Sequence, residues 1–236
     1  MSFQICDRQQ SQKNYHFIVI EGLDGVGKST TSEHLVEMLQ GFSFHTPDSR
    51  LNEIRGIFDN SSITTRTAFY NAANHLASEG IKIQLCHSSV VLDRYYGSTL
   101  AAAYSHNLFQ RAELNSKAKS FSENLMQPDI TIHLKIDEKV RVARINNRGK
   151  DFNRDERKLI EDREFRTRYL EALDIVSDIS IDITDKRSDE IAALIVEYLK
   201  NCGDHNPSQS KSSTLCTKKP ECSEECLSHR KIHFAS

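Results

Sequence analysis

Apolar residues occur along the chain in two alternating patterns, short continuous runs and helically spaced stripes. The continuous runs predict buried strands at 16–21, 89–92 and 130–136, and a further strand is predicted at 179–184. Strands that are apolar throughout are typical of a parallel sheet with both faces covered.

The stretches between these runs carry apolar residues at helical spacing. They predict helices at 28–40, 51–58, 64–80, 138–146 and 157–176, and a last helix that starts near Ser188. The last helix has a regular apolar stripe, which we interpret as core packing and which consists of Ile191, Leu194, Ile195, Tyr198 and Leu199. Strands that alternate with helices predict an α/β fold with helices on both faces of the sheet.

The two ends of the chain differ in composition from the middle. Residues 1–14 are polar, and residues 202–236 are rich in Ser and Lys with few large apolar side chains. A segment like 202–236 buries too little surface to offset its ordering entropy. We therefore expect a polar tail at 1–14, a folded domain at 15–201 and a disordered tail at 202–236. The alternative for the last segment is a zinc site made by Cys216, Cys222, Cys226, His229 and His233, but their spacing matches no familiar finger.

Charge and composition narrow the range of partners and compartments. The net charge is −2, which favours neither a nucleic-acid nor a membrane partner. Residues 1–14 lack both the apolar core of a secretory signal and the Arg-rich pattern of a mitochondrial presequence. The predicted compartment is the cytoplasm, with mitochondria less favoured. Four of the six cysteines lie at or after position 202, so no disulfide framework is expected in the main body.

A glycine-rich segment joins the first predicted strand to the first predicted helix. It reads Gly22-Leu23-Asp24-Gly25-Val26-Gly27-Lys28-Ser29, is followed by Thr30, and fits the P-loop pattern G-x-x-x-x-G-K-[ST]. The glycines let backbone N–H groups face the phosphates of a nucleoside triphosphate, and the helix adds its positive N-terminal end. Lys28 supplies a charge for the β- and γ-phosphates, and Ser29 supplies a hydroxyl for Mg²⁺.

The tripeptide Asp93-Arg94-Tyr95 directly follows the strand predicted at 89–92. The carboxyl end of a parallel strand is where such sheets place ligand chemistry. Asp93 can hold Mg²⁺ through water, and Arg94 can grip a phosphate with two hydrogen bonds. The alternative is a surface turn with a structural Asp–Arg pair.

A run of basic residues spans the end of one predicted helix and the loop after it. Its members are Arg141, Arg144, Arg148, Lys150, Arg154 and Arg157. The run could close over a transferring phosphoryl group, or it could be a solvated charged face. Arg148 and Arg154, which flank Gly149, are the preferred candidates for catalysis.

These three signals together predict phosphoryl transfer between two phosphates. A phosphate monoester is already largely ionised at neutral pH, because its second pKa is near about 6, so the acceptor needs little base catalysis. Positioning and charge neutralisation then set the rate. The predicted catalytic residues are Lys28, Asp93, Arg94, Arg148 and Arg154, with Ser29 and Asp93 at the metal.

At this point the sequence resembles the thymidylate kinase family of nucleoside-monophosphate kinases. The resemblance covers about residues 16–200 and is carried by 20–30, by 91–95 with Ser98, by Pro128-Asp129 and by the basic run after Arg144. Within the family, 57–79 and Ser98-Thr99 look most like the UMP-CMP kinase branch found in mitochondria. The resemblance implies a three-layer P-loop NTPase fold with a five-stranded parallel sheet, a mobile basic lid, and Mg²⁺ with ATP. Family members are commonly dimers, which favours a homodimer.

The resemblance also implies roles at the acceptor. Asp24 would contact the sugar 3′-hydroxyl, Arg94 the acceptor phosphate, and the helix around Phe69 and Tyr70 would form the base pocket. The implied acceptor-binding set is Asp24, Arg50, Phe69, Tyr70, Arg94 and Tyr95.

Two departures from the family keep the acceptor open. No arginine occurs at 71–75, where thymidylate kinases usually carry one, and Tyr104 lies two residues later than the usual aromatic. We take dTMP as the first acceptor, with UMP/CMP or dUMP/dCMP as the alternative. A catalytically weak nucleotide-binding regulatory protein is the alternative from another class, although intact Lys28, Ser29 and Arg94 argue against it.

Overall fold

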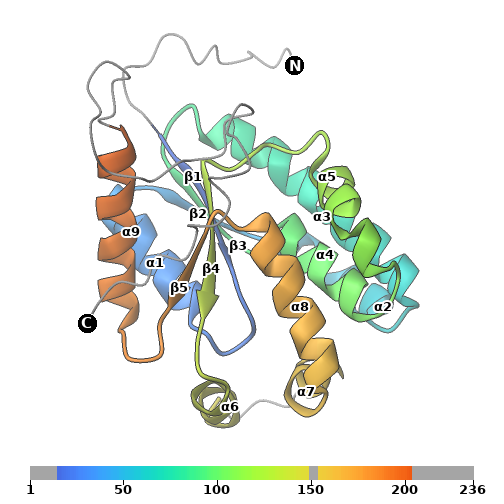
Figure 1. Cartoon of the computed structure of the whole chain (residues 1–236). Helices are drawn as coiled ribbons and strands as arrows, with labels where there is room; N and C mark the ends of the chain where they lie inside the picture. Colours follow the sequence, from blue (N-terminus) through green and yellow to red (C-terminus); the bar gives the residue numbers. More distant parts are fainter. Residues whose placement is uncertain (1–14, 149–153, 204–236) are drawn as a thin grey trace, which may run out of the picture.

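The computed structural model describes residues 15–148 and 154–203, which form a layered α/β structure around one sheet (Figure 1). Its five strands are all parallel and lie in the order β2-β3-β1-β4-β5. Their bounds are β1 Phe17–Glu21, β2 Phe42–His45, β3 Val90–Asp93, β4 Ile130–Lys135 and β5 Ile179–Asp182. The predicted five-stranded parallel sheet is confirmed.

The sheet lies between two groups of helices (Figure 1). One group contains α1 (Lys28–Leu39) and α9 (Ser188–Gly203). The other group contains α3 (Ile63–Gln84), α4 (Tyr96–Ser105), α5 (Leu114–Ser122) and α8 (Arg163–Val176). Successive residues of β1 face opposite sides of the sheet. Ile18 belongs to a core cluster with Leu35 of α1, and Phe17 belongs to a cluster with Ile81 of α3. This confirms the three-layer arrangement.

Strand β2 was not among the strands predicted from apolar runs. It has only four residues, and Phe42, Ser43 and His45 are exposed because the strand forms an edge of the sheet. An edge strand needs no continuous apolar run, so its sequence gives a weak signal. The helices α4 and α5 and the short 3₁₀ turn Arg111–Glu113 were not predicted either.

The helix predicted at 157–176 is two helices, α7 (Arg154–Glu161) and α8. The break occurs at Asp162, whose carboxylate accepts a hydrogen bond from the backbone N–H of Phe165 and so caps α8. A second pair of elements, the 3₁₀ turn Ser49–Leu51 and α2 (Asn52–Asp59), leads from β2 to α3. The helix predicted at 138–146 is α6 (Glu138–Asn146), which Asp137 caps by accepting hydrogen bonds from the backbone N–H groups of Lys139 and Val140.

The register of the sheet brings three functional segments to one edge. Ile20 pairs with Asp93, and Glu21 pairs with His133, so the carboxyl ends of β1, β3 and β4 are adjacent. The P-loop follows β1 at this edge, and Arg94 follows β3. No helix in the described parts of the chain is long and apolar enough to cross a membrane.

Candidate active site

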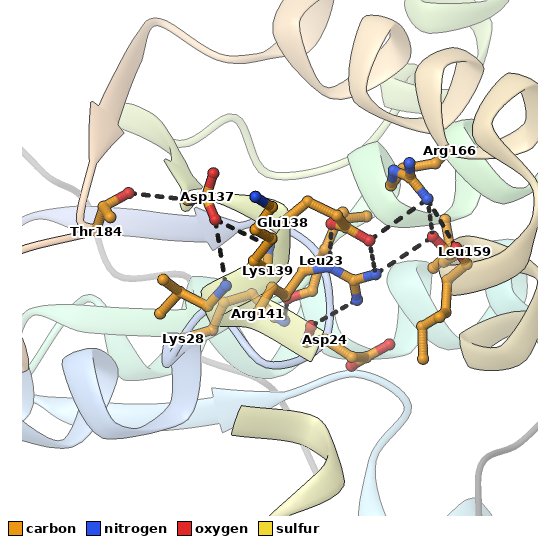
Figure 2. Close-up of polar contacts among 12 residues, drawn as sticks. Leu23, Asp24, Lys28, Asp137, Glu138, Lys139, Arg141, Leu159, Arg166 and Thr184 are labelled. Atoms are coloured by element: carbon orange, nitrogen blue, oxygen red, sulfur yellow. Dashed lines mark hydrogen bonds and ion pairs between the residues drawn. The ribbon is translucent and has the colours of Figure 1, made fainter. Parts of the chain in front are cut away.

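The P-loop wraps around the start of α1, and Lys28 is the first residue of that helix. The Lys28 side chain is only 6% exposed, and its ammonium donates a 2.9 Å hydrogen bond to the carbonyl of Leu23 within the loop (Figure 2). Burial, with a smaller contribution from the charge of Arg94, lowers the pKa of Lys28 to about 8. A phosphate placed in the loop would stabilise the charged form of this ammonium.

Ser29 and Asp93 meet across the sheet edge, as expected for a metal site. The Ser29 hydroxyl donates a 2.6 Å hydrogen bond to Oδ2 of Asp93. The other carboxylate oxygen, Oδ1, is buried and has no hydrogen-bond partner among the described residues. A buried carboxylate oxygen without a partner is costly. A hydroxyl beside a free carboxylate oxygen is a donor set that suits Mg²⁺.

Arg94 connects the P-loop to the segment after β3. Its Nη2 lies 2.5 Å from Oδ1 of Asp24, and its Nη1 donates to the hydroxyl of Ser98 at 3.0 Å and to that of Tyr169 at 3.4 Å. Burial alone would raise the pKa of Asp24, but the charges of Arg94 and Lys28 outweigh it and hold the pKa well below its usual range. Asp24 therefore stays ionised and fixes the orientation of the guanidinium.

Glu21 holds the segment after β3 in place through hydrogen bonds, a role that sequence reasoning missed. The residue is fully buried at the end of β1 and accepts hydrogen bonds from the backbone N–H groups of Tyr95 and Ser98, at 3.0 and 3.1 Å. These groups lie at the N-terminus of α4, so the carboxylate caps that helix. Gly97 leaves room for the contact, because a Cβ there would lie 2.8 Å from Oε1 of Glu21.

A cavity of about 580 Å³ opens next to Asp24 and Arg94. Its lining comes from β2, α2, α3, α4, α7 and α8, and includes Thr46, Tyr70, Tyr95, Thr99 and Tyr169. The volume falls in the range of small-molecule sites. The cavity therefore meets the P-loop at the position expected for an acceptor.

Of the two predicted base-pocket aromatics, Tyr70 lines the cavity. Its hydroxyl donates a 2.8 Å hydrogen bond to Asp59. The ring of Phe69 instead stacks on Phe58, with centroids 4.4 Å apart and planes 9° apart. Phe69 is buried and does not contribute to the lining.

Arg50, which the resemblance implied for the acceptor, and Tyr104, which departs from the family's usual spacing, are both absent from the lining of the cavity. The Arg50 side chain is 73% exposed and forms an ion pair with Asp48 at 2.9 Å, two residues away. The structure therefore does not bring Arg50 to the acceptor site. Tyr104 is buried with its hydroxyl on Glu171 and its ring on Phe109.

The basic run divides into three kinds of residue. Arg154 lines the cavity at the start of α7, whereas Arg148 is 44% exposed and lies 3.9 Å from Glu156. Arg144 and Arg157 are exposed, as expected for a solvated face. Arg141 is fully buried, which the charge pattern did not predict. Lys150 and Gly149 lie outside the described residues.

A polar cluster of Arg66, His106 and Asp155 joins α3, the end of α4 and α7 beside the cavity. Nη2 of Arg66 lies 2.7 Å from Oδ2 of Asp155 and 3.0 Å from Nε2 of His106, and the same His106 nitrogen lies 3.0 Å from Oδ1 of Asp155. Arg66 and Asp155 both line the cavity. Sequence reasoning missed this arginine, which lies one helical turn before Tyr70 on α3.

The described residues contain no group of three or more His, Cys, Asp or Glu side chains that could hold a metal ion. The Cys216, Cys222, Cys226, His229 and His233 set lies outside them, so the tail interpretation stays a prediction. The polar tail at 1–14 and all but the first two residues of the tail predicted at 202–236 also lie outside the described residues and stay predictions, whereas Cys202 and Gly203 end α9.

Comparison with known proteins points to one family. A family model described as thymidylate kinase matches residues 20–195. A probable thymidylate kinase of Methanocaldococcus jannaschii is 30% identical over 194 residues, which cover 78% of this chain and 96% of that protein. A thymidylate kinase of Staphylococcus epidermidis is 30% identical over 206 residues, covering 78% of this chain and 98% of that protein.

Two further matches bear on the UMP-CMP kinase branch and on the fold. The human protein named UMP-CMP kinase 2, mitochondrial, is 28% identical over 165 residues, which cover 68% of this chain but only 37% of that protein. The solved structure of thymidylate kinase from Candida albicans has a TM-score of 0.64 at 21% identity, covering 81% of this chain and 94% of that one. At that identity the likeness shows the fold, a P-loop NTPase fold.

Proposed function

We propose that this chain, which belongs to the thymidylate kinase family, transfers the γ-phosphoryl group of ATP to a pyrimidine nucleoside monophosphate, with dTMP as the first candidate. Members of this family are nucleoside-monophosphate kinases, so the class of the enzyme follows from the membership. The acceptor, the metal and the site residues are our proposals for this chain.

The observation that carries the proposal is the contact between Asp24 and Arg94. Asp24 of the P-loop and Arg94, which we assign to the phosphate, lie 2.5 Å apart, and both line one cavity. ATP in the P-loop would then have its γ-phosphate facing an acceptor held in that cavity. The γ-phosphate and the acceptor phosphate could react here without a side chain that acts as a general base.

The transfer itself is a displacement at the γ-phosphorus. An oxygen of the acceptor phosphate forms the new bond to that phosphorus, and the bond to the bridging oxygen of ADP breaks. Lys28 and Arg94 neutralise charge on the transferring group, and we place Arg154 and Arg148 as further cations from α7 and the end of α6. Asp24 orients Arg94 and contacts the acceptor sugar.

Mg²⁺ would be held by the Ser29 hydroxyl and, directly or through water, by Asp93. The unpartnered buried oxygen of Asp93 supports this assignment. When bound, the ion would supply positive charge that stabilises the charge developing on the phosphates. The Ser29 hydroxyl would serve it as a ligand.

One observation favours UMP or CMP, or their deoxy forms, as a second acceptor class. Segment 71–75 carries no arginine, and Asn74 is buried with its amide donating a 3.1 Å hydrogen bond to Thr99. Base recognition at this helix would therefore differ from that expected for a thymine-reading arginine. A homodimer and a cytoplasmic compartment also stay predictions.

A coupled ADP-release assay tests the proposal. The purified chain is given ATP, Mg²⁺ and, separately, dTMP, dUMP, UMP, dCMP and CMP, with AMP and GMP as controls. We expect turnover with pyrimidine monophosphates and the highest kcat/KM with dTMP. Turnover of none of the pyrimidine monophosphates would refute the proposal, and a preference for CMP or UMP would select the alternative.

A further inference from the structure

Arg141 of α6 is the largest fully buried side chain of the described structure, with 0% exposure. Its guanidinium makes four hydrogen bonds (Figure 2). Nε and Nη2 form a bidentate pair with the carboxylate of Glu138, each at 2.7 Å. Nη1 donates to the carbonyl of Asp24 at 3.1 Å, and Nη2 also donates to the carbonyl of Leu159 at 3.2 Å.

Burying an arginine side chain costs free energy of solvation. Removing a guanidinium from water is compensated only when partners of good geometry replace the water. Here one carboxylate and two carbonyls use all three guanidinium nitrogens. A lysine ammonium has no planar fork and could not reproduce this set of directions.

The two carbonyls belong to parts of the chain that are far apart in sequence. The Asp24 carbonyl lies in the P-loop, and the Leu159 carbonyl lies in the last turn of α7, where helical carbonyls lack partners within the helix. Arg141 thus joins the P-loop, α6 and α7 through one planar group.

A second, apolar contact holds α6 against the P-loop. Gly25 has φ +91°, and a Cβ there would lie 2.6 Å from Cγ1 of Ile145 and 3.1 Å from the carbonyl oxygen of Arg141. The helix therefore touches the loop backbone along a full turn, from Arg141 to Ile145. A shift of α6 would be transmitted to the peptide of Asp24.

We propose that Arg141 is a positioning residue for phosphoryl transfer. It holds the Asp24 peptide, so the Asp24 carboxylate stays where it orients Arg94, and it fixes α7, which carries Arg154 into the cavity. This role rests on the proposed function, because its effect on rate presupposes a transfer at Arg94. Its effect on the P-loop is independent of the acceptor.

Arg166 of α8 provides a matched control within the same cluster. Its Nη1 donates to the carbonyls of Leu159 and Ile160 at 2.7 and 3.1 Å and lies 3.4 Å from Glu138. It shares two partners with Arg141 but has no bond to the P-loop. Loss of Arg166 therefore perturbs α7 without removing the link to Asp24.

The test compares Arg141→Lys, Arg141→Met and Arg166→Met with the wild type. The measurements are Tm, kcat and KM for each substrate, and the Kd of MgADP by calorimetry. Misplacement by about 1 Å can cost roughly 100-fold in rate, so we expect kcat to fall about 10- to 100-fold in both Arg141 variants. We expect MgADP binding to weaken several-fold in both Arg141 variants but to stay within about twofold of the wild type in Arg166→Met, and we expect kcat of Arg166→Met to fall less than that of Arg141→Lys, because only α7 is perturbed.

Arg141→Lys keeps the proposal falsifiable if Arg141→Met does not fold, because it retains the charge and most of the volume. Arg141→Lys with wild-type kcat and MgADP affinity would overturn the proposal. Equal losses of rate in Arg141→Lys and Arg166→Met would also overturn it, since the P-loop bond would then be irrelevant. If the wild type turns over no monophosphate, the proposed function fails, and the MgADP affinities alone decide the role at the P-loop.

Discussion

The carboxylate of Asp24 lies 2.5 Å from the guanidinium of Arg94, although 70 positions separate the two residues in the chain. The contact exists because β1 and β3 are neighbours in the sheet and end at the same edge. It joins the loop that would hold the donor to the segment that would hold the acceptor phosphate.

Replacing Arg94 by Lys tests the second half of this pair. The lysine keeps a positive charge but loses the fork that reaches Asp24, Ser98 and a phosphate together. By analogy with loss of one transition-state donor, we expect kcat to fall about 100- to 1000-fold. Steady-state kinetics measure this, with Arg187→Lys as a control on an arginine that is 73% exposed. A kcat within threefold of the wild type would contradict a phosphate role for the fork.

The depressed pKa of Lys28 predicts a pH dependence of ATP affinity. The pKa is about 8 in the free protein, and the bound triphosphate favours the charged ammonium. Affinity for MgATP should therefore be constant below about pH 8 and fall by up to about tenfold per pH unit above it. Binding above that pH should take up a proton, which calorimetry in buffers of different ionisation enthalpy detects. Lys28→Met should remove the proton uptake and abolish transfer, and an unchanged uptake would assign the proton to another group.

Ser29 and Asp93 predict a specific change in metal requirement. Asp93→Asn removes the charge that the unpartnered Oδ1 offers to a cation, and Ser29→Ala removes the hydroxyl. Losing such a group typically costs about 10- to 100-fold in metal affinity, so more Mg²⁺ should be needed for half-maximal rate. Titrating Mg²⁺ at fixed ATP measures this shift, and Ser43→Ala on the exposed edge strand is the control. Identical Mg²⁺ curves for all variants would place the metal elsewhere.

The cap formed by Glu21 predicts that Gly97 is intolerant of a methyl group. A Cβ at Gly97 would lie 2.8 Å from both Oε1 of Glu21 and Cγ2 of Val176. We expect Gly97→Ala to reduce the free energy of unfolding by about 1–3 kcal/mol. Gly56 is the matched control: it is also helical, nothing lies within 4 Å of its added Cβ, and Ala there should stabilise by up to about 1 kcal/mol. Denaturant unfolding of both variants measures the difference, and equal values would refute the crowding at Gly97.

Local patterns in the sequence were sufficient for much of the fold and for the nucleotide loop. The buried strands β1, β3 and β4 are apolar runs, so each could be predicted from its own residues, and the partly buried strand β5 was predicted as well. Lys28, Ser29 and Asp93 follow from the P-loop pattern and from the rule that functional residues follow parallel strands. These inferences need only neighbours in the chain.

Contacts between distant segments could not be predicted in this way. The bond from Arg141 to the Asp24 carbonyl spans 117 positions, and the one from Arg94 to Tyr169 spans 75. A charge run looks the same in sequence whether its arginines face water or a carbonyl. Glu21 and Arg66 were missed for the same reason, because their partners lie on other elements.

The sequence also did not show which of the adjacent aromatic residues Phe69 and Tyr70 on α3 faces the cavity. One residue turns the helix by about 100°, so Phe69 and Tyr70 point in different directions and need not both face the cavity. Packing against neighbouring elements decides which ring faces the cavity. Here the ring of Phe69 stacks on Phe58, and Tyr70 lines the cavity.

The last prediction therefore separates Tyr70 from Phe69. Tyr70→Ala should raise the KM of the acceptor about 5- to 100-fold, the range expected for loss of one aromatic stacking contact of about 1–3 kcal/mol. Tyr70→Phe keeps the ring and should lose less, although it removes the hydroxyl bond to Asp59. Phe69→Leu should lower Tm, because it disrupts the stack with Phe58, and should leave the acceptor KM within about twofold. Steady-state kinetics measure the effect on KM, and thermal unfolding measures the effect on stability. A larger change of KM in Phe69→Leu than in Tyr70→Ala would show that Phe69, not Tyr70, contacts the base.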